Sequence, residues 1–356
     1  MHLTTHLCPP IADLSFMQVG GRPKAYIQTW SEEDIQSAYQ WAEQQQLPVY
    51  ILGGGSNIVC ADGVLHAVVI QPKNQRIEWK KVNTGWQVRA HAGALWENLV
   101  HQAVQRKAWG IECLAGIPGH VGAAPIQNIG AYGQSLSDHC TAVRVFDRAQ
   151  QSFETLTPQE CCWSYRDSIF KQHPQRYCVV WIELSLGSTA TPIRYVQLQD
   201  ALDQQGIDSD QNIETIYHTV RRIRASKSML WDKEDPNHRS VGSFFLNPIV
   251  SQDQWHFVCT QAQKLNLEHV PHWPQEQGIK LAAAWLIEQS GCHKGYTHSE
   301  YSGVALSSKH TLAIINRGTA CATDVIRFAT LIQNRVEQQF AVTLEIEARI
   351  WGFDFS

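Results

Sequence analysis

The sequence predicts an α+β protein rather than a doubly wound parallel sheet. Segments patterned as strands and segments patterned as helices follow one another irregularly along the 356 residues, without the strict strand–helix–strand alternation of a parallel sheet. Hydrophobic residues make up 44% of the chain and charged residues 17%, which is enough apolar material for sizeable cores. At this length we expect two or three domains.

The first elements are a helix and short strands. Three acidic residues follow Ser31, which is predicted to cap a helix that runs to about Gln46, with Asp34 near its positive end. Short apolar runs, and an alternating pair of runs around a turn that contains Gly85, predict two strands and a hairpin at 49–52, 67–70 and 77–92.

Helical spacing returns over residues 94–108, where Leu95, Leu99 and Ala103 form one apolar row, and Gly110 is the expected stop. The remaining pattern predicts strands at 142–147 and 178–186, a polar linker at 231–240, helices near 280–289 and 323–339, and an alternating strand over 342–350.

Composition excludes several classes of protein. The near balance of 29 basic and 33 acidic side chains argues against a dedicated nucleic-acid binder. No stretch approaches the ~18 apolar residues of a membrane span, and no secretory signal pattern is visible. The ten cysteines include no C-x-x-C pair, and His269 and His272 lack metal-binding partners, so no metal site is expected. We therefore expect a cytoplasmic protein with reduced thiols.

A run of three glycines follows the strand predicted at 49–52. In Leu52–Asn57, adjacent glycines allow successive backbone N–H groups to turn toward a phosphate. The spacing does not fit G-x-G-x-x-G, and Ile58–Cys60 reads as a strand rather than a helix, so a Rossmann site is not expected. A plain glycine turn is the alternative.

A longer segment of small residues lies at 116–133. It offers a surface against which a flat ring system or a pyrophosphate can lie, and Gln127 and Asn128 offer uncharged hydrogen-bonding groups. The alternative is a long loop packed under a helix, but structureless loops of this length are usually functional.

Three single residues stand in patterns that could carry chemistry. Arg166, between aromatic residues, can present a planar fork to a carboxylate, although Asp167 could instead neutralise it. Ser243 in Gly242–Pro248 lacks the pattern of a hydrolase nucleophile but could donate a proton; capping a turn is the alternative. Alternation over 342–350 places Glu347 on one face with Glu345 and Arg349, where either solvent or a cleft could receive it.

Taken in order, these segments resemble the UDP-N-acetylenolpyruvoylglucosamine reductase (MurB) family of flavoenzymes. The resemblance covers nearly the whole chain, and it rests on LGGGSN at 52–57, IPGHVGAAPIQNIGAYG at 117–133, YRDSIFK at 165–171, GSFFLNP at 242–248, KLAAAWLIEQSG at 280–291 and LEIEAR at 344–349. It implies a two-lobed FAD-binding domain of the vanillyl-alcohol-oxidase type plus a C-terminal α+β substrate-binding domain. The implied division is 1–75 for the first lobe, 76–235 for the second lobe with a tyrosine-bearing substrate loop, and 236–356 for the C-terminal domain.

The resemblance also implies an activity: NADPH-dependent reduction of UDP-N-acetylglucosamine enolpyruvate to UDP-N-acetylmuramate in peptidoglycan precursor synthesis. FAD would be held non-covalently, NADPH would be the co-substrate, and the enzyme is expected to be a monomer. A hydride would pass from flavin N5 to C3 of the enolpyruvyl group, and Ser243 would give a proton to C2. Arg166 would stabilise the charge that develops, with Glu347 as the third catalytic residue.

Binding residues are implied in the same way. The cofactor-binding residues would be Gly53, Gly54, Gly55, Ser56, Asn57, Ile117, Pro118, Gly119, Gly122, Ala123, Gln127, Asn128, Gly130, Ala131, Tyr132 and Gly133. The substrate-binding residues would be Tyr195, as in the type I subgroup, with Lys227, Asn247 and Gln289. Arg224 belongs to a basic cluster that would attract a diphosphate, and a solvated helix face is the alternative explanation for that cluster.

The chain departs from the family pattern at Leu246, His120 and Ser307, which affects expected affinity more than reaction class. Two other functions stay open on the sequence alone. One is a flavin oxidase on the same scaffold, and the other is a sugar-nucleotide-binding protein without redox activity.

Overall fold

The computed structural model describes residues 1–353 except 6–7, 191, 194 and 205–211. Its chain divides into two compact units: unit 1 contains residues 1–9, 23–55 and 66–230, and unit 2 contains residues 10–22, 56–65 and 231–356. Each unit mixes helices with mainly antiparallel strands, which confirms the α+β prediction. No helix in the part of the chain described is both long and apolar enough to cross a membrane.

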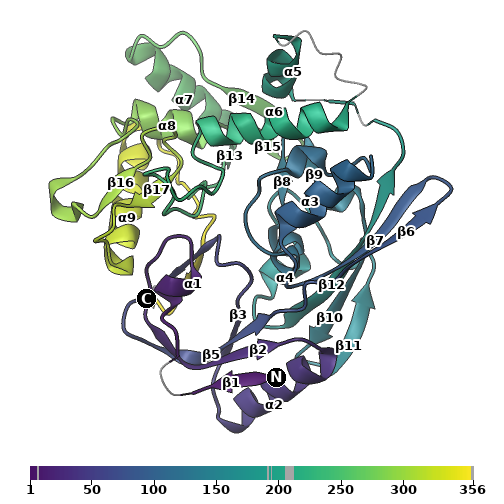
Figure 1. Cartoon of the computed structure of the whole chain (residues 1–356). Helices are drawn as coiled ribbons and strands as arrows, with labels where there is room; N and C mark the ends of the chain where they lie inside the picture. Colours follow the sequence, from purple (N-terminus) through teal and green to yellow (C-terminus); the bar gives the residue numbers. More distant parts are fainter. Residues whose placement is uncertain (6–7, 191, 194, 205–211, 354–356) are drawn as a thin grey trace. The chain divides into compact units, whose positions relative to one another are not determined.

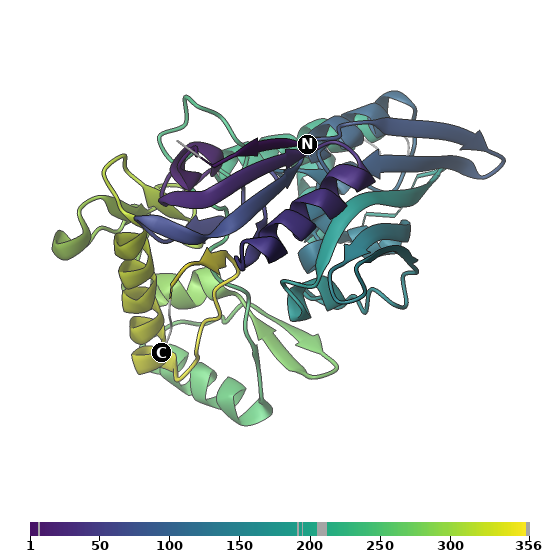
Figure 2. The same cartoon turned by 90° about the horizontal axis from the view of Figure 1, so that it is seen from below.

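One sheet of unit 1 carries the helix predicted at Ser31. The strand order is β1-β2-β5-β3, with bounds His2–Thr4, Arg22–Thr29, Val64–Pro72 and Val49–Ile51. Helix α2 (Glu32–Gln44) begins where the Ser31 hydroxyl accepts the Asp34 N–H at 3.1 Å, which confirms the predicted cap. The apolar face of α2 packs on this sheet (Figure 2).

The second sheet of unit 1 has the order β11-β10-β12-β7-β6 and is antiparallel throughout. Its strands are β6 (Ile77–Val82), β7 (Gly85–His91), β10 (Cys140–Asp147), β11 (Ser152–Leu156) and β12 (Tyr177–Gly187). The predicted hairpin is confirmed, since β6 and β7 form one edge of the sheet (Figure 1).

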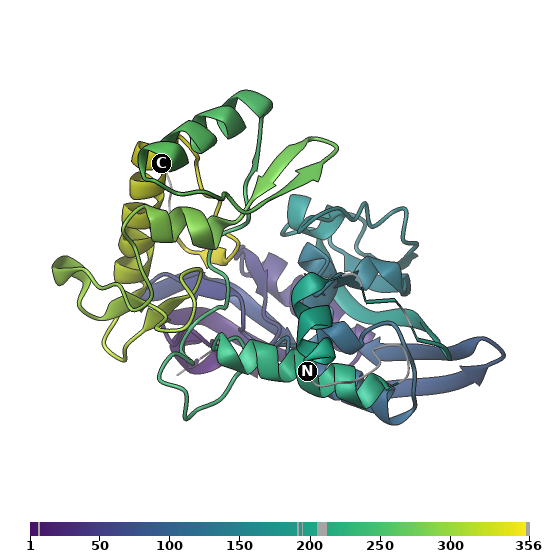
Figure 3. The ribbon, with the colours of Figure 1, turned by 90° about the horizontal axis from the view of Figure 1, so that it is seen from above.

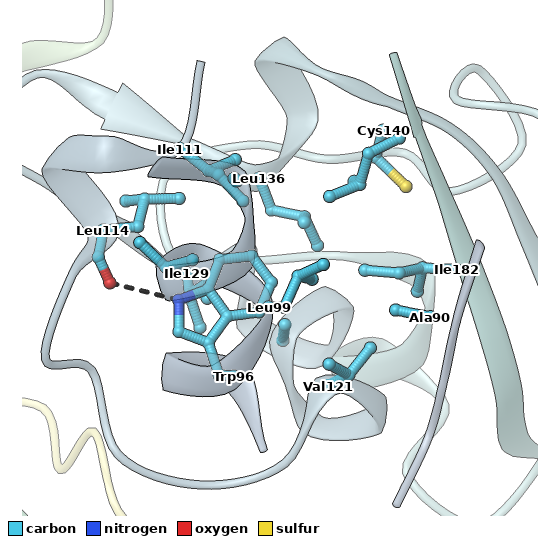
Figure 4. Packing of buried hydrophobic residues seen from close by; sticks show 14 of the residues in the cluster. Ala90, Trp96, Leu99, Ile111, Leu114, Val121, Ile129, Leu136, Cys140 and Ile182 are labelled. Carbon is cyan, nitrogen blue, oxygen red and sulfur yellow. Dashed lines mark hydrogen bonds between the residues drawn. The ribbon is translucent and has the colours of Figure 1, made fainter. Parts of the chain in front are cut away.

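Helix α3 (Trp96–Gln105) covers this sheet and builds the core beneath the small-residue segment. Trp96 is fully buried, and its indole N–H donates to the Leu114 carbonyl at 3.1 Å (Figure 4). The helix ends earlier than predicted, because Lys107 takes a left-handed conformation with φ of 52°. Gly110 is therefore not the residue that ends the helix.

The remaining elements of unit 1 are short, apart from α6. They are η1 (Glu112–Leu114), η2 (Val121–Gln127), β8 (Gly130–Ala131), β9 (Gln134–Ser135), η3 (Leu136–Asp138), α4 (Ile169–Gln172), α5 (Val196–Asp203) and α6 (Ile213–Ser226).

Unit 2 is organised around α9 (Ala322–Phe340), whose buried face includes Phe328 and Ile332. The hairpin of β14 and β15 packs near α7 (Figure 3). The other elements are α1 (Ile11–Leu14), β4 (Ile58–Cys60), β13 (Ile249–Val250), α7 (Gln252–Lys264), β14 (His272–Gln275), β15 (Gly278–Leu281), α8 (Ala283–Gln289), η4 (Ser299–Tyr301), β16 (Val304–Leu306), β17 (Ile314–Asn316) and β18 (Arg349–Trp351).

Two predictions in unit 2 are corrected. The helix expected near 280–289 begins only at Ala283, because the residues before it pair as β15. The strand expected over 342–350 is wrong for most of its length, since only Arg349–Trp351 is a strand, paired in parallel with β4. Its earlier residues bond instead to the irregular segment 244–246, so Glu345 is exposed while Glu347 is half-buried.

Candidate functional site

The glycine loop after β3 packs against the start of the small-residue segment, within unit 1. A Cβ atom on Gly54 would lie 2.7 Å from the Gly119 Cα, and one on Gly53 would lie 3.2 Å from the Ala123 Cβ. The Gly53 carbonyl accepts from Gln71 Nε2 at 2.8 Å, which ties the loop to β5. Two motifs about 65 residues apart in sequence therefore meet backbone to backbone, where only glycine leaves room.

The small-residue segment is itself folded rather than a loose loop. Its residues 121–127 form the 3₁₀ helix η2, and a Cβ atom on Gly122 would lie 2.6 Å from the Ala92 Cβ, so η2 lies directly against the end of β7. The Asn128 side chain bonds to Ser137 and to the Ser164 carbonyl, at 3.0 and 3.3 Å. Asn128 thus holds the segment in place through its own side chain.

The Arg166 motif is tied to this segment at several points. The Trp163 indole N–H donates to the Pro125 carbonyl at 3.0 Å, and the Ser168 hydroxyl donates to the Ile126 carbonyl at 2.6 Å. Arg166 has a left-handed φ of 54°, and its Nη2 donates to the Gly130 carbonyl at 2.8 Å. Its guanidinium therefore lies at the predicted cofactor segment. Asp167 accepts from Gln172 Nε2 at 2.7 Å.

The remaining predicted residues of unit 1 flank this arrangement. The Tyr132 and Tyr195 rings meet edge to face at 5.4 Å. Arg224 Nη2 donates to the Met229 carbonyl at 2.8 Å, and Lys227 Nζ donates to Gln197 Oε1 at 2.8 Å. Burial lowers the pKa of Lys227, and the nearby Arg224 cation lowers it further. Burial likewise lowers the pKa of Arg224. Neither cation is paired with a carboxylate in these bonds, so this side of the unit suits an anionic ligand.

Ser243 lies in unit 2 on a firmly held segment. Gly242 has a left-handed φ of 76° with open space around its α-carbon, which turns the chain into Ser243. Phe244 and Phe245 are at most 1% exposed, and the Phe244 N–H donates to the Leu312 carbonyl at 2.8 Å. The serine is half-buried next to these two anchors.

Glu347 is brought to the Ser243 segment by main-chain bonds. The Glu347 N–H donates to the Phe244 carbonyl at 2.8 Å, and the Leu246 N–H donates to the Glu345 carbonyl at 2.9 Å. Leu246, where the family pattern differs, thus serves this pairing through its backbone. Two of the three predicted catalytic residues therefore occupy neighbouring segments of unit 2, while Arg166 belongs to unit 1.

Asn247 and Gln289 lie at the two ends of helix α8. Asn247 Oδ1 accepts the Ala283 N–H at 2.9 Å, and Gln289 is the last residue of the helix. Six helical steps separate the two ends by about 9 Å along the axis. An extended ligand along α8 could contact both.

One residue that contributes to the site was missed. Glu97 on α3 accepts the Gly116 N–H at 2.6 Å and the Tyr217 hydroxyl at 2.7 Å, and it also pairs with Arg221. It ties the small-residue segment to α6, which carries Arg224. Its acidic position in the first turn of α3 was the available signal.

Two departures from the family pattern have clear surroundings. His120 lies against the glycine loop, with its Cδ2 atom 3.2 Å from where a Gly54 Cβ would be, and its Nδ1 is buried without a hydrogen bond. Burial, aided by the Lys73 cation, lowers its pKa to about 4. Ser307 is fully buried and its hydroxyl accepts the Lys309 N–H at 3.1 Å.

Comparison with protein families gives two matches. Residues 235–351 match the C-terminal domain of UDP-N-acetylenolpyruvoylglucosamine reductase, and residues 23–155 match an FAD binding domain. The predicted combination of an FAD-binding domain and a second α+β domain is thereby confirmed.

Comparison with individual proteins agrees. The UDP-N-acetylenolpyruvoylglucosamine reductase of Thermobifida fusca is 38% identical over 351 residues, which cover 96% of this chain and 97% of that protein. The protein of the same name from Mycobacterium marinum is 35% identical over 355 residues, covering 96% and 94%. The structure of the Thermus caldophilus reductase (MurB) has a TM-score of 0.65 and 23% identity, and it covers 97% of this chain and 98% of its own. That structural similarity shows the shared fold.

Proposed function

Because the chain belongs to the UDP-N-acetylenolpyruvoylglucosamine reductase family, we propose that it reduces UDP-N-acetylglucosamine enolpyruvate to UDP-N-acetylmuramate with NADPH and FAD. The observation that carries this proposal is the main-chain pairing in unit 2, where a serine suited to proton donation and a carboxylate lie on bonded segments.

The residues of unit 1 fit an FAD molecule. Gly53, Gly54 and Gly122 allow the loop and the small-residue segment to pack closely against neighbouring parts of unit 1. Successive backbone N–H groups in such glycine-containing turns can bind a pyrophosphate. The residues proposed to hold the cofactor are those of the loop 53–57 and of the segment 117–133, without a covalent link. When bound, the flavin would supply the hydride, drawn from NADPH, that the reaction requires.

Arg166 would bind and stabilise negative charge on the enolpyruvyl carboxylate. Its Nη2 bond to the Gly130 carbonyl holds the guanidinium at the predicted cofactor segment, and a guanidinium can form paired, charge-assisted hydrogen bonds with a carboxylate. A preorganised donor of this kind lowers the energy of developing charge because it needs no rearrangement during the reaction.

Ser243 would deliver the proton to C2 of the substrate. The two buried phenylalanines that follow it hold its backbone in place, and a hydroxyl on such a segment can act as a proton donor. The Glu347 N–H donates to the carbonyl of Phe244, the residue after Ser243. We propose that the Glu347 carboxyl group helps to stabilise the charge that develops on the substrate beside C2.

The residues proposed to bind the sugar nucleotide are polar, aromatic or cationic. Arg224 and Lys227 would attract the diphosphate, Tyr195 would cover the substrate, and Asn247 and Gln289 would contact it from α8. We place the reaction in the cytoplasm, where nucleotide substrates are made, and propose a monomer with domains divided near residues 75 and 235.

The test is substrate-dependent NADPH oxidation by the purified protein, with the product identified by mass. We expect NADPH consumption beyond the one equivalent that reduces the bound flavin only when the enolpyruvyl sugar nucleotide is present, and we expect the product to gain two hydrogen atoms. Consumption that needs oxygen and leaves the sugar nucleotide unchanged would instead identify a flavin oxidase. A colourless protein that takes up no FAD would leave only a binding role.

A further inference from the structure

The main chain around Glu347 is held from a second side by Asn57. The Glu347 carbonyl accepts from Asn57 Nδ2 at 3.4 Å, and the Arg349 N–H donates to the Asn57 carbonyl at 2.9 Å. All three residues belong to unit 2. One asparagine therefore contacts the main chain at both residue 347 and residue 349.

This contact lies where regular structure begins. The parallel ladder of β18 with β4 starts at the Arg349–Ile58 pair, so Glu347 lies two residues before it. On its other side, the Glu347 N–H donates to the Phe244 carbonyl. The Asn57 side chain thus extends the ladder by one further bond, to the residue whose carboxylate is proposed to act.

Asn57 is also the last residue of the glycine loop. Gly53–Gly55 belong to unit 1, and the chain enters unit 2 at Ser56. A ligand that orders this loop would therefore order the residue that fixes the Glu347 main chain.

We infer that Asn57 is a positioning residue for Glu347 and that occupancy of the glycine loop is transmitted through Asn57 to the placement of this carboxylate. The inference rests on the proposed function, because it takes the cofactor loop and the role of Glu347 from it. Asn57 acts here through another residue, in addition to its predicted contact with the cofactor.

The first test needs no turnover. Amide hydrogen exchange is followed by mass spectrometry in peptides covering 344–351, with and without saturating FAD. We expect FAD to slow exchange there several-fold in the unsubstituted protein, and we expect Asn57→Asp, which keeps the side-chain size but lacks the N–H donor, to remove that effect. Peptides covering 323–339 of α9 provide the internal reference. Equal protection of 344–351 in both proteins would overturn the inference.

The second test is a double-mutant cycle in anaerobic stopped-flow experiments with FAD-saturated enzyme. Asn57→Ala should slow the oxidative half-reaction about tenfold, as expected for one lost hydrogen bond, and should slow it more than it slows flavin reduction by NADPH. In a Glu347→Gln background the same change should cost nothing further. The same factor in both backgrounds, equal slowing of both half-reactions, or no effect would each overturn the inference.

Gln333→Ala is the matched control. Gln333 Nε2 donates to the Leu344 carbonyl at 2.7 Å, which is the same kind of bond to the same segment three residues before Glu347. We expect this variant to lower stability and leave the half-reactions unchanged. Oxidative slowing equal to that of Asn57→Ala would show that any loosening of the segment suffices, and would overturn the specific role of Asn57. FAD uptake, read from the visible spectrum of the same samples, tests the proposed function separately.

Discussion

The predicted site residues are held in place differently in the two units. In unit 1, the predicted cofactor segments meet at glycines. A Cβ atom added at Gly54 would lie only 2.7 Å from the Gly119 Cα, so the two segments can pack together only because Gly54 has no side chain. In unit 2, Ser243 and Glu347 are placed by ordinary main-chain hydrogen bonds between segments about 100 residues apart. Added volume should therefore damage unit 1, whereas removal of a functional group should stop chemistry in unit 2 without unfolding it.

The largest expected effect is that of Ser243→Ala. Loss of a positioned general acid typically costs ~10²–10⁴-fold, so the oxidative half-reaction should slow by that factor while flavin reduction by NADPH continues. Stability should change by less than about 0.5 kcal/mol. Stopped-flow absorbance of each half-reaction is the measurement, and equal slowing of both would remove Ser243 from the proton transfer.

A serine elsewhere in the unit serves as the control for this variant. The Ser251 hydroxyl caps α7 by accepting the Gln254 N–H at 3.2 Å. Ser251→Ala should cost about 1 kcal/mol of stability and leave both half-reactions unchanged.

Arg166→Lys tests the one predicted catalytic residue of unit 1. Lysine keeps the charge but loses the planar fork, and each charge-assisted bond contributes roughly 1.5–3 kcal/mol. We therefore expect kcat/KM to fall about 10–100-fold in steady-state assays. Arg89→Lys is the control, since Arg89 pairs with Glu183 at 3.1 Å on the sheet. Unchanged turnover in the Arg166 variant would make Arg166 structural.

Gly54→Ala tests the dependence of unit 1 on close backbone approach. The added methyl group would meet backbone atoms of Gly119, and overpacking of this kind typically costs about 1–3 kcal/mol. FAD affinity, measured by fluorescence titration, should fall correspondingly. At Gly187, also in unit 1, an added Cβ would meet only ordinary contacts, the nearest at 3.6 Å. If the Gly187→Ala and Gly54→Ala variants bound FAD equally well, FAD binding would not depend on the absence of a side chain at residue 54.

The smallest effect concerns His120 and pH. Its folded pKa of about 4 lies below the ordinary 6.5, so between these values the unfolded chain binds the extra proton. Stability should rise with pH across this window and be lost as pH falls toward 4, by less than ~1.4 kcal/mol per pH unit because the side chain is only half-buried. In denaturant unfolding, the free energy of unfolding of His120→Asn should not show this rise with pH. Identical pH profiles would mean that His120 titrates normally.

The contrast between the units explains what the sequence could predict. The helix at Ser31, the hairpin over 77–92 and α9 follow local rules of capping and periodicity, and the structure confirms them. The glycine segments were visible as composition, although the contact that requires glycine there, between residues 54 and 119, is long-range.

Long-range pairing was not visible in the same way. Residues 342–350 alternate like a strand, yet most of them bond to the irregular segment 244–246, because the partner decides the conformation. The end of α3 at Lys107 and the contacts of Glu97 and Asn57 depend on tertiary structure, which no local pattern encodes. Residues 191 and 194, near the predicted substrate residue Tyr195, lie outside the described residues.

The most direct test of the account is the colour of the purified protein in the absence of oxygen. We predict a yellow FAD spectrum that bleaches on addition of NADPH and returns when the enolpyruvyl sugar nucleotide is added. Colour that stays bleached with this substrate, and returns only when air is admitted, would contradict the account.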